Sequence, residues 1–224
     1  MMKYKAVLFD MDGTLLDTLA DMAAAVNRIL SVHGDPAEVR LCAACKTRTV
    51  EEVRAFVGNG ARKLMERALP PDVTGDAFEA LLEEYRQWYE AHACVRTAPY
   101  PGVPAVLAAL HRAGVRCAVV SNKPDGATRE LAARFFPGLP AFGQQDGIPA
   151  KPAPDMVYHA LAELGVEASA AAYVGDSEVD VALARNAGLP LVAVSWGFRG
   201  REALEEAGAA LVVDDAATLL ENML

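Results

Sequence analysis

The chain has 224 residues, with 21 lysines and arginines against 30 aspartates and glutamates, a formal net charge of −9, and 53% hydrophobic residues. A chain of this length buries a core without disulfides or a structural metal. Its acidic charge excludes proteins that wrap nucleic acid or lie on an anionic bilayer, because both surfaces would repel it.

The first predicted element is a short buried strand over residues 4–9, and residues 17–96 are helical throughout. Amphipathic patterns predict helices over 19–30 and 78–91. Thr49 with Glu52 forms a capping box for a further helix that runs toward Leu69. The turn-rich segment 99–102 then returns the chain to a different pattern.

From residue 103 onward, helices and strands alternate. Helices are predicted over 103–113, 154–164 and 178–187, and a glycine follows each of them. Strands are predicted over 115–120, 171–174, 191–194 and 211–213. This alternation indicates an α/β fold, a Rossmann-like parallel sheet with ligands beyond the carboxyl ends of its strands. We predict a core of residues 1–16 and 97–224 and a small inserted α-helical domain of residues 17–96.

No uncharged apolar stretch approaches the roughly 20 residues that cross a bilayer, and the first apolar run is too short for a secretion signal. We therefore expect a cytoplasmic protein with no membrane partner and with free thiols. The pair Cys42 and Cys45 lacks the second pair or the histidine that a zinc site needs, so two incidental thiols are expected.

An acidic motif, Asp10-Met11-Asp12-Gly13-Thr14, lies where the first strand ends. Two acids spaced two apart on an extended segment point to the same side, and Gly13 lets the backbone turn sharply. This clusters negative charge where a cation could bind. An ordinary Asp-Gly turn with solvated acids is equally compatible with these five residues alone.

Three more motifs follow later strands. Ser121 and Asn122 come directly after the predicted strand 115–120, and Lys151 stands before a helix whose free amides attract anions. Asp176 lies at the end of the strand 171–174, just beyond its last residue. Asp180 lies one turn into the next helix, so the two carboxylates can converge. Each motif alone also suits a loop, a surface charge or a helix cap. Those simpler interpretations do not explain their order along the chain.

In this order and at these strand ends, the four motifs resemble the haloacid dehalogenase superfamily of phosphohydrolases. The resemblance covers residue 4 to about 213 and includes the helical insert as the family's cap domain. Within the family, four segments look most like phosphoglycolate phosphatases: Val57-Gly58-Asn59-Gly60, Ser121-Asn122-Lys123-Pro124, Lys151-Pro152-Ala153-Pro154 and Gly175-Asp176-Ser177. The resemblance implies hydrolysis of a small phosphate monoester, most simply 2-phosphoglycolate, by a monomer or homodimer with no nucleic acid or membrane partner.

Charge indicates a metal in such a site. Four aspartates would bring about −4 together and a phosphate monoester roughly −2, which a dry pocket does not tolerate without cations. Oxygen ligands suit Mg²⁺. By resemblance, its ligands are the Asp10 and Asp176 carboxylates and the Asp12 carbonyl, and Asp180 orients this shell from behind.

The resemblance also implies the catalytic roles. Asp10 attacks phosphorus to form an aspartyl-phosphate, and Asp12 protonates the leaving alkoxide and then activates water. Ser121 and Lys151 hold the transferring oxygens. The residues expected to bind phosphate or substrate are Gly13, Thr14, Ser121, Asn122, Lys151 and Arg62.

The cap is expected to close over the site and to set specificity. Arg62 or Lys63 would meet a substrate carboxylate, although both equally suit solvated surface charges. The segment Trp196-Gly197-Phe198 follows another strand end, where it lines the mouth or packs the cap hinge.

Other activities remain open. Pyrophosphatase and sugar-phosphate phosphatase activities share these motifs. Met22 stands where phosphohexomutase relatives usually carry a histidine, and Asp12 stands where dehalogenases lack an acid. Lys46 and Lys63 are cap lysines, so a Schiff-base phosphonatase is also compatible. From another class, a receiver-like binding protein also uses a phospho-accepting aspartate, but its usual length is about half that of this chain.

Overall fold

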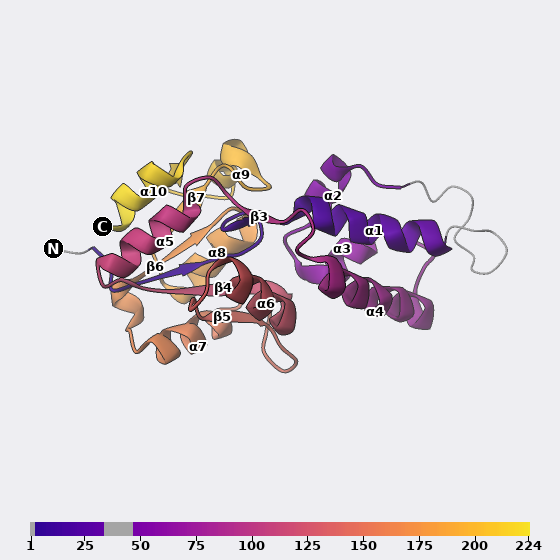
Figure 1. Cartoon of the computed structure of the whole chain (residues 1–224), viewed down its shortest axis with the longest axis horizontal. Coiled ribbons are helices and arrows are strands. Elements are labelled where there is room, and N and C mark those ends of the chain that lie inside the picture. The colour runs from indigo at the N-terminus through magenta and orange to yellow at the C-terminus, as the bar shows by residue number, and fades with distance from the viewer. Residues whose placement is uncertain (1–2, 34–46) are drawn as a thin grey trace. The chain divides into compact units, whose positions relative to one another are not determined.

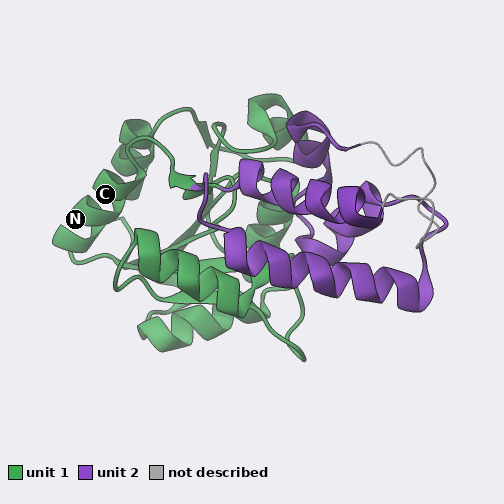
Figure 2. Ribbon diagram, turned by 45° about the vertical axis from the view of Figure 1, so that its right-hand side comes forward, with its two compact units in different colours: residues 1–17, 98–224 green, residues 18–97 purple. Residues whose placement is uncertain are grey.

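The structure is a computed structural model of the whole chain, and it describes residues 3–33 and 47–224. Cys42, Cys45 and Lys46 lie outside the described residues. The chain forms two compact units (Figure 2), unit 1 with residues 1–17 and 98–224 and unit 2 with residues 18–97. No helix within the described ranges has the length and apolar character that a membrane span requires.

Unit 1 is built on a six-stranded sheet in the order β5-β4-β1-β6-β7-β8 (Figure 1). Its strands are β1 (Ala6–Phe9), β4 (Arg116–Pro124), β5 (Ala141–Gln144), β6 (Ala171–Gly175), β7 (Leu191–Val194) and β8 (Val212–Val213). Every pairing in this sheet is parallel. The predicted parallel α/β fold is confirmed.

The register of β1 with its neighbours places the functional strand ends together. Phe9 pairs with Val119 of β4 and with Val174 of β6. The four residues of β1 are fully buried, as expected for the central strand of a parallel sheet. The residues that follow these strands therefore emerge side by side at one edge of the sheet.

Helices cover both faces of this sheet. They are α5 (Val103–Arg112), α6 (Asp125–Phe135), α7 (Asp155–Leu164), α8 (Glu178–Ala187), α9 (Gly200–Glu206) and α10 (Ala216–Met223). On one face, α7 and α8 pack against alternate residues of the central strands, such as Leu8 and Tyr173. Residues of the other parity, such as Phe9, point to the opposite face, where α5 contacts β4 and α10 contacts β7.

Unit 2 consists of helices α1 (Leu19–His33), α2 (Val50–Phe56), α3 (Gly60–Ala68) and α4 (Gly75–His92). The predicted capping box is present, since Thr49 Oγ1 accepts from Glu52 N at 3.2 Å and Thr49 N donates to Glu52 Oε2 at 2.7 Å. The prediction of one helix from there toward Leu69 is wrong. Gly58 has a φ of 116°, which a helix does not accept, so the chain breaks and restarts as α3.

The chain leaves unit 1 and returns to it through a short antiparallel ribbon of β2 (Leu16–Asp17) and β3 (Ala98–Pro99). Within unit 2, the buried carboxylate of Asp21 accepts from the backbone N–H groups of Arg96 and Thr97, each at 2.9 Å. The two segments that connect the units are therefore held by hydrogen bonds on both sides, in the β2–β3 ribbon of unit 1 and at the Asp21 carboxylate of unit 2.

Candidate active site

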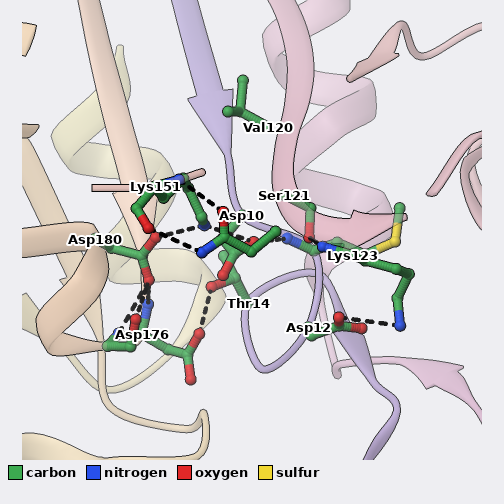
Figure 3. Close-up of polar contacts among 12 residues, drawn as sticks. Asp10, Asp12, Thr14, Val120, Ser121, Lys123, Lys151, Asp176 and Asp180 are labelled. Carbon is green, nitrogen blue, oxygen red and sulfur yellow. Dashed lines mark hydrogen bonds and ion pairs between the residues drawn. The ribbon is translucent and has the colours of Figure 1, made fainter. Parts of the chain in front are cut away.

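Side chains from four of the predicted motifs meet at the carboxyl edge of the sheet (Figure 3). Asp10 follows β1, Ser121 lies in β4 where the strand passes that edge, and Asp176 follows β6. The backbone N–H of Asp10 donates to Val174 O at 2.9 Å, which fixes the start of the acidic turn against β6.

Three buried carboxylates form the centre of this arrangement. Oxygens of Asp10, Asp176 and Asp180 lie within 4.8 Å of one another. The three residues are 8%, 1% and 0% exposed. Their side chains supply oxygen donors of the kind that hard divalent cations prefer. The cluster therefore has the donor chemistry of a metal site.

Electrostatics support this assignment. Burial raises the pKa of Asp10 from its ordinary 3.8 to about 7, and attraction to Lys151 does not offset the effect. Burial, followed by repulsion from Asp180 and Asp10, raises the pKa of Asp176 well above its usual range. The groups of the protein therefore compensate the negative charge of this cluster only in part, and a bound cation would compensate the rest.

Lys151 supplies the one ammonium group in contact with this cluster among the described residues. Its Nζ lies 2.9 Å from Asp10 Oδ1, 2.8 Å from Asp180 Oδ1 and 3.1 Å from Tyr173 Oη. Burial alone would lower the pKa of Lys151, but the carboxylates of Asp10 and Asp180 outweigh it and hold the pKa well above its usual value. Lys151 is therefore a permanent cation that faces Asp10.

Tyr173 is a site residue that the sequence did not reveal. Its hydroxyl lies 3.1 Å from Val120 O, 3.2 Å from Asp180 Oδ1 and 3.1 Å from Lys151 Nζ, so it connects β6, β4 and the lysine. A tyrosine in a fully buried strand needs a polar partner for its hydroxyl. That requirement was the available signal, but it does not say which partner.

Asn122 fixes the backbone of Lys151. Asn122 Nδ2 donates to Lys151 O at 3.1 Å, and Lys151 N donates to Asn122 Oδ1 at 2.7 Å. These two hydrogen bonds hold the loop that carries Lys151 against the end of β4. The neighbouring Ser121 is buried, and its Oγ accepts from Lys123 N at 3.3 Å.

Asp176 is held through both carboxylate oxygens. Thr14 Oγ1 donates to Oδ1 at 3.0 Å, and the backbone N–H of Phe198 donates to Oδ2 at 2.8 Å. Trp196 Nε1 in turn donates to Thr14 O at 3.1 Å. The segment that follows β7 thus joins the turn after β1 around Asp176, a role that the sequence did not indicate.

Two glycines make room for the Asp176 carboxylate. A Cβ on Gly13 would lie 2.3 Å from Asp176 Oδ2, and Gly13 also has a φ of 85°. A Cβ on Gly197 would lie 2.3 Å from Asp176 Cβ and 2.4 Å from Gly13 O. Both positions exclude any side chain while Asp176 keeps its place.

Gly197→Ala is therefore expected to displace Asp176 and to weaken binding of a divalent cation by about 10-fold or more, as loss of ligand orientation does. Isothermal titration without substrate measures this affinity. Gly188→Ala is the control, because its Cβ meets no atom and only its φ of 69° is strained. The control should lower the melting temperature and leave the affinity unchanged. Equal affinities in Gly197→Ala and wild type would contradict this account of Asp176.

Asp12 lies apart from the carboxylate cluster and faces a second lysine. Lys123 Nζ lies 3.1 Å from Asp12 Oδ2. The turn that carries Asp12 is closed by a hydrogen bond from Gly13 N to Leu16 O at 2.9 Å. Figure 3 shows this pair on one side of Asp10 and Lys151, Asp176 and Asp180 on the other.

Arg62 lies in unit 2. Its guanidinium forms a forked ion pair with Glu79, with N–O distances of 2.8 and 2.7 Å, and Lys63 pairs with Glu66. The expected contact of Arg62 or Lys63 with a substrate carboxylate stays a prediction.

The chain is similar to a known family. A model of the haloacid dehalogenase-like hydrolases matches residues 4–188. A phosphoglycolate phosphatase from Rhodospirillum rubrum is 36% identical over 96% of this chain and 89% of its own length. One from Pseudomonas syringae pv. tomato is 34% identical over 98% of this chain and 80% of its own length. An N-acetylmuramic acid 6-phosphate phosphatase from Pseudomonas aeruginosa is 31% identical over 98% of this chain and 95% of its own length.

Solved structures agree with this match. A crystal structure from Lactobacillus delbrueckii subsp. bulgaricus, provisionally assigned as a phosphoglycolate phosphatase, has a TM-score of 0.89 and 36% identity. The alignment covers 100% of this chain and 99% of that one.

Proposed function

Because the chain belongs to the haloacid dehalogenase-like hydrolases and is a phosphoric monoester hydrolase, we propose that it is a Mg²⁺-dependent phosphatase that hydrolyses 2-phosphoglycolate through an aspartyl-phosphate. One structural observation carries the proposal: at the carboxyl edge of the sheet, Asp10 lies beside two further buried carboxylates, and Lys151 Nζ lies 2.9 Å from its Oδ1. The names of the relatives support the substrate.

The cluster suits Mg²⁺ because its donors are oxygens and its charge lacks compensation. Asp10 and Asp176 would hold the ion through their carboxylates, together with the Asp12 carbonyl. Both Asp180 oxygens already accept hydrogen bonds, from Lys151 on one side and Ser177 on the other, so Asp180 would orient the other ligands. When bound, the ion neutralises phosphate charge and increases the electrophilicity of phosphorus.

Asp10 acts as the nucleophile in this proposal. One of its carboxylate oxygens forms a bond to phosphorus while the bond from phosphorus to the ester oxygen breaks. Asp12 gives its proton to that leaving oxygen. Asp12 then takes a proton from water, which attacks the aspartyl-phosphate, releases phosphate and restores Asp10.

Lys151 holds the transferring phosphoryl group. Its ammonium is aimed at Asp10 by Asp180 and Tyr173, and its backbone is fixed by Asn122. Ser121 and the backbone amide of Asn122 would bind further phosphoryl oxygens, and Gly13 and Thr14 complete the turn on the β1 side. Preorganised donors of this kind stabilise the charge that develops in phosphoryl transfer.

Metal binding should be coupled to pH. The folded-state pKa of Asp10 is raised from 3.8 to about 7, so the contribution of Asp10 to the stability of the metal-free protein falls as the pH rises between these values. Saturating Mg²⁺ should remove this loss. At 100 times the dissociation constant, stabilisation is about 2.7 kcal/mol, or roughly 5 to 11 °C for a chain of this size.

Thermal unfolding with Mg²⁺ or EDTA at pH 5.5 and pH 8 tests this coupling. The Mg²⁺-dependent shift should be larger at pH 8, where protons compete less with the ion for Asp10. Asp176→Asn, which lacks one ligand charge, should show a much smaller shift at both values. A wild-type shift that is equal at both pH values, or absent, would contradict the assignment.

The substrate is tested by a phosphate-release screen with Mg²⁺ or EDTA. It should include 2-phosphoglycolate, pyrophosphate, hexose phosphates, nucleotides and N-acetylmuramic acid 6-phosphate. We expect the highest kcat/KM for 2-phosphoglycolate and no turnover in EDTA. The near full-length match to an N-acetylmuramic acid 6-phosphate phosphatase makes that sugar phosphate the second candidate substrate. A higher kcat/KM for it than for 2-phosphoglycolate would make it the proposed substrate instead.

The other activities have their own signatures. A phosphohexomutase would convert hexose phosphates without releasing phosphate, and a phosphonatase would be trapped by borohydride through a cap lysine such as Lys63. A receiver-like protein would accumulate phosphorylated Asp10. Cytoplasmic location and a monomeric or homodimeric state stay predictions.

A further inference from the structure

We propose that Lys123 recognises a carboxylate on the carbon next to the ester oxygen, so the enzyme prefers phosphate esters of 2-hydroxy acids. This inference rests on the proposed phosphatase function and places part of the specificity in unit 1. It assigns a role to a lysine that the proposed catalytic steps do not use.

Unit 1 holds Lys123 in place. The residue lies within β4, next to the site residues Ser121 and Asn122. Its backbone N–H donates to Ser121 Oγ at 3.3 Å, and Thr128 Oγ1 donates to its carbonyl at 3.2 Å. The side chain then reaches Asp12, with 3.1 Å between Nζ and Oδ2.

The two buried lysines of unit 1 serve different parts of the site. Lys151 contacts Asp10 and Asp180 and thus faces the phosphoryl group. Lys123 contacts Asp12, whose carboxylate is outside the three-acid cluster. Figure 3 shows the two ammonium groups on opposite sides of Asp10. Since Asp12 is the group that protonates the leaving oxygen, Lys123 lies on the leaving-group side.

The distances bring Lys123 within reach of the leaving group. Asp12 must approach the ester oxygen to about 3 Å to transfer a proton. With 3.1 Å between Lys123 Nζ and Asp12 Oδ2, the ammonium lies within roughly 6 Å of that oxygen. In a 2-hydroxy acid ester, the carboxylate is attached to the carbon that bears the ester oxygen. An ammonium has three donors, so it can bind this carboxylate and Asp12 together.

A second role for Lys123 predicts a different result. If it only positions Asp12, its loss slows every substrate by the same factor. If it binds the substrate carboxylate, its loss slows carboxylate-bearing substrates more. The ratio of kcat/KM for 2-phosphoglycolate to that for 2-hydroxyethyl phosphate, which lacks the carboxylate, separates the two roles.

This ratio should be measured for wild type, Lys123→Met, Lys123→Arg, Arg62→Met and Lys5→Met. Wild type should prefer 2-phosphoglycolate by about 10-fold or more, the effect of one charge-assisted hydrogen bond. Lys123→Met should bring the ratio close to one, and Lys123→Arg should keep most of the preference. Lys5 precedes β1 at the end opposite Asp10, so Lys5→Met removes the same charge and should change neither substrate.

Several outcomes would overturn the inference. An unchanged ratio in Lys123→Met, with both substrates slowed equally, would leave Lys123 as a positioning residue only. If the preference for 2-phosphoglycolate disappears in Arg62→Met but persists in Lys123→Met, recognition of the substrate carboxylate belongs to unit 2. If Lys123→Met does not fold, a wild-type ratio near one would still refute the proposal. If the substrate screen finds no phosphate release from 2-phosphoglycolate, that result refutes the proposed substrate instead.

Discussion

Asp10→Asn should reduce turnover of every substrate by about 10⁴-fold or more, because removal of a covalent nucleophile removes the reaction path itself. An amide oxygen is a poor nucleophile toward phosphorus, and the substitution keeps the shape of the side chain. Steady-state phosphate release measures the loss. Acid quench during turnover, followed by mass spectrometry, should find phosphate on Asp10 in wild type and no phosphorylated residue at this position in the variant.

Stability separates this loss from unfolding. The raised pKa of Asp10 means that its ionised form is unfavourable in the metal-free fold. The neutral Asn should therefore leave the metal-free protein at least as stable as wild type at pH 8. Turnover that survives in a folded Asp10→Asn protein would refute the assigned nucleophile.

Lys151→Met is expected to damage both activity and stability. Breaking a buried ion pair costs about 3–5 kcal/mol, because it leaves the other charges buried and unpaired. Here the groups left are the Asp10 and Asp180 carboxylates, 2.9 and 2.8 Å from Nζ. The melting temperature should fall by roughly 6–20 °C, and kcat should fall by about 10²–10³-fold with the lost phosphoryl contact.

The sign of the pH effect follows from the pKa of Lys151, which is raised above its usual value. Its contribution to stability is fully present at neutral pH and is lost only as the pH rises past the usual lysine range. Differential scanning calorimetry at pH 7.5 therefore detects the full effect, and Lys5→Met is the matched charge control. A melting temperature equal to that of wild type would show that Lys151 does not compensate the cluster.

The motifs at strand ends could be predicted because their signals are local. Asp10, Ser121 and Asp176 each follow or end a run of buried apolar residues, and a parallel sheet brings such positions to one edge. The short strand β5 was missed, since Ala141–Gln144 contains a glycine and no β-branched residue. The break between α2 and α3 depends on the backbone angles of residues 57–60, with an extended Val57 and a positive φ at Gly58 and Gly60.

The contacts that orient these motifs could not be predicted in the same way. The Tyr173 hydroxyl meets Lys151 only because the fold places the turn that carries Lys151 against β6. Gly197 matters only because Asp176, 21 positions earlier, occupies the space of its missing side chain. The pairing of Lys123 with Asp12 likewise joins distant segments. Such contacts depend on tertiary packing and leave no pattern in the local sequence.

The most direct test is a crystal structure with Mg²⁺ and beryllium fluoride, which mimics a phosphoryl group on aspartate. We predict BeF₃⁻ on the Asp10 carboxylate, with Lys151 and Ser121 contacting its fluorines. Mg²⁺ should lie about 2.0–2.1 Å from oxygens of Asp10 and Asp176 and from the Asp12 carbonyl. BeF₃⁻ bound to another residue, or a metal ion that does not contact both Asp10 and Asp176, would contradict the account.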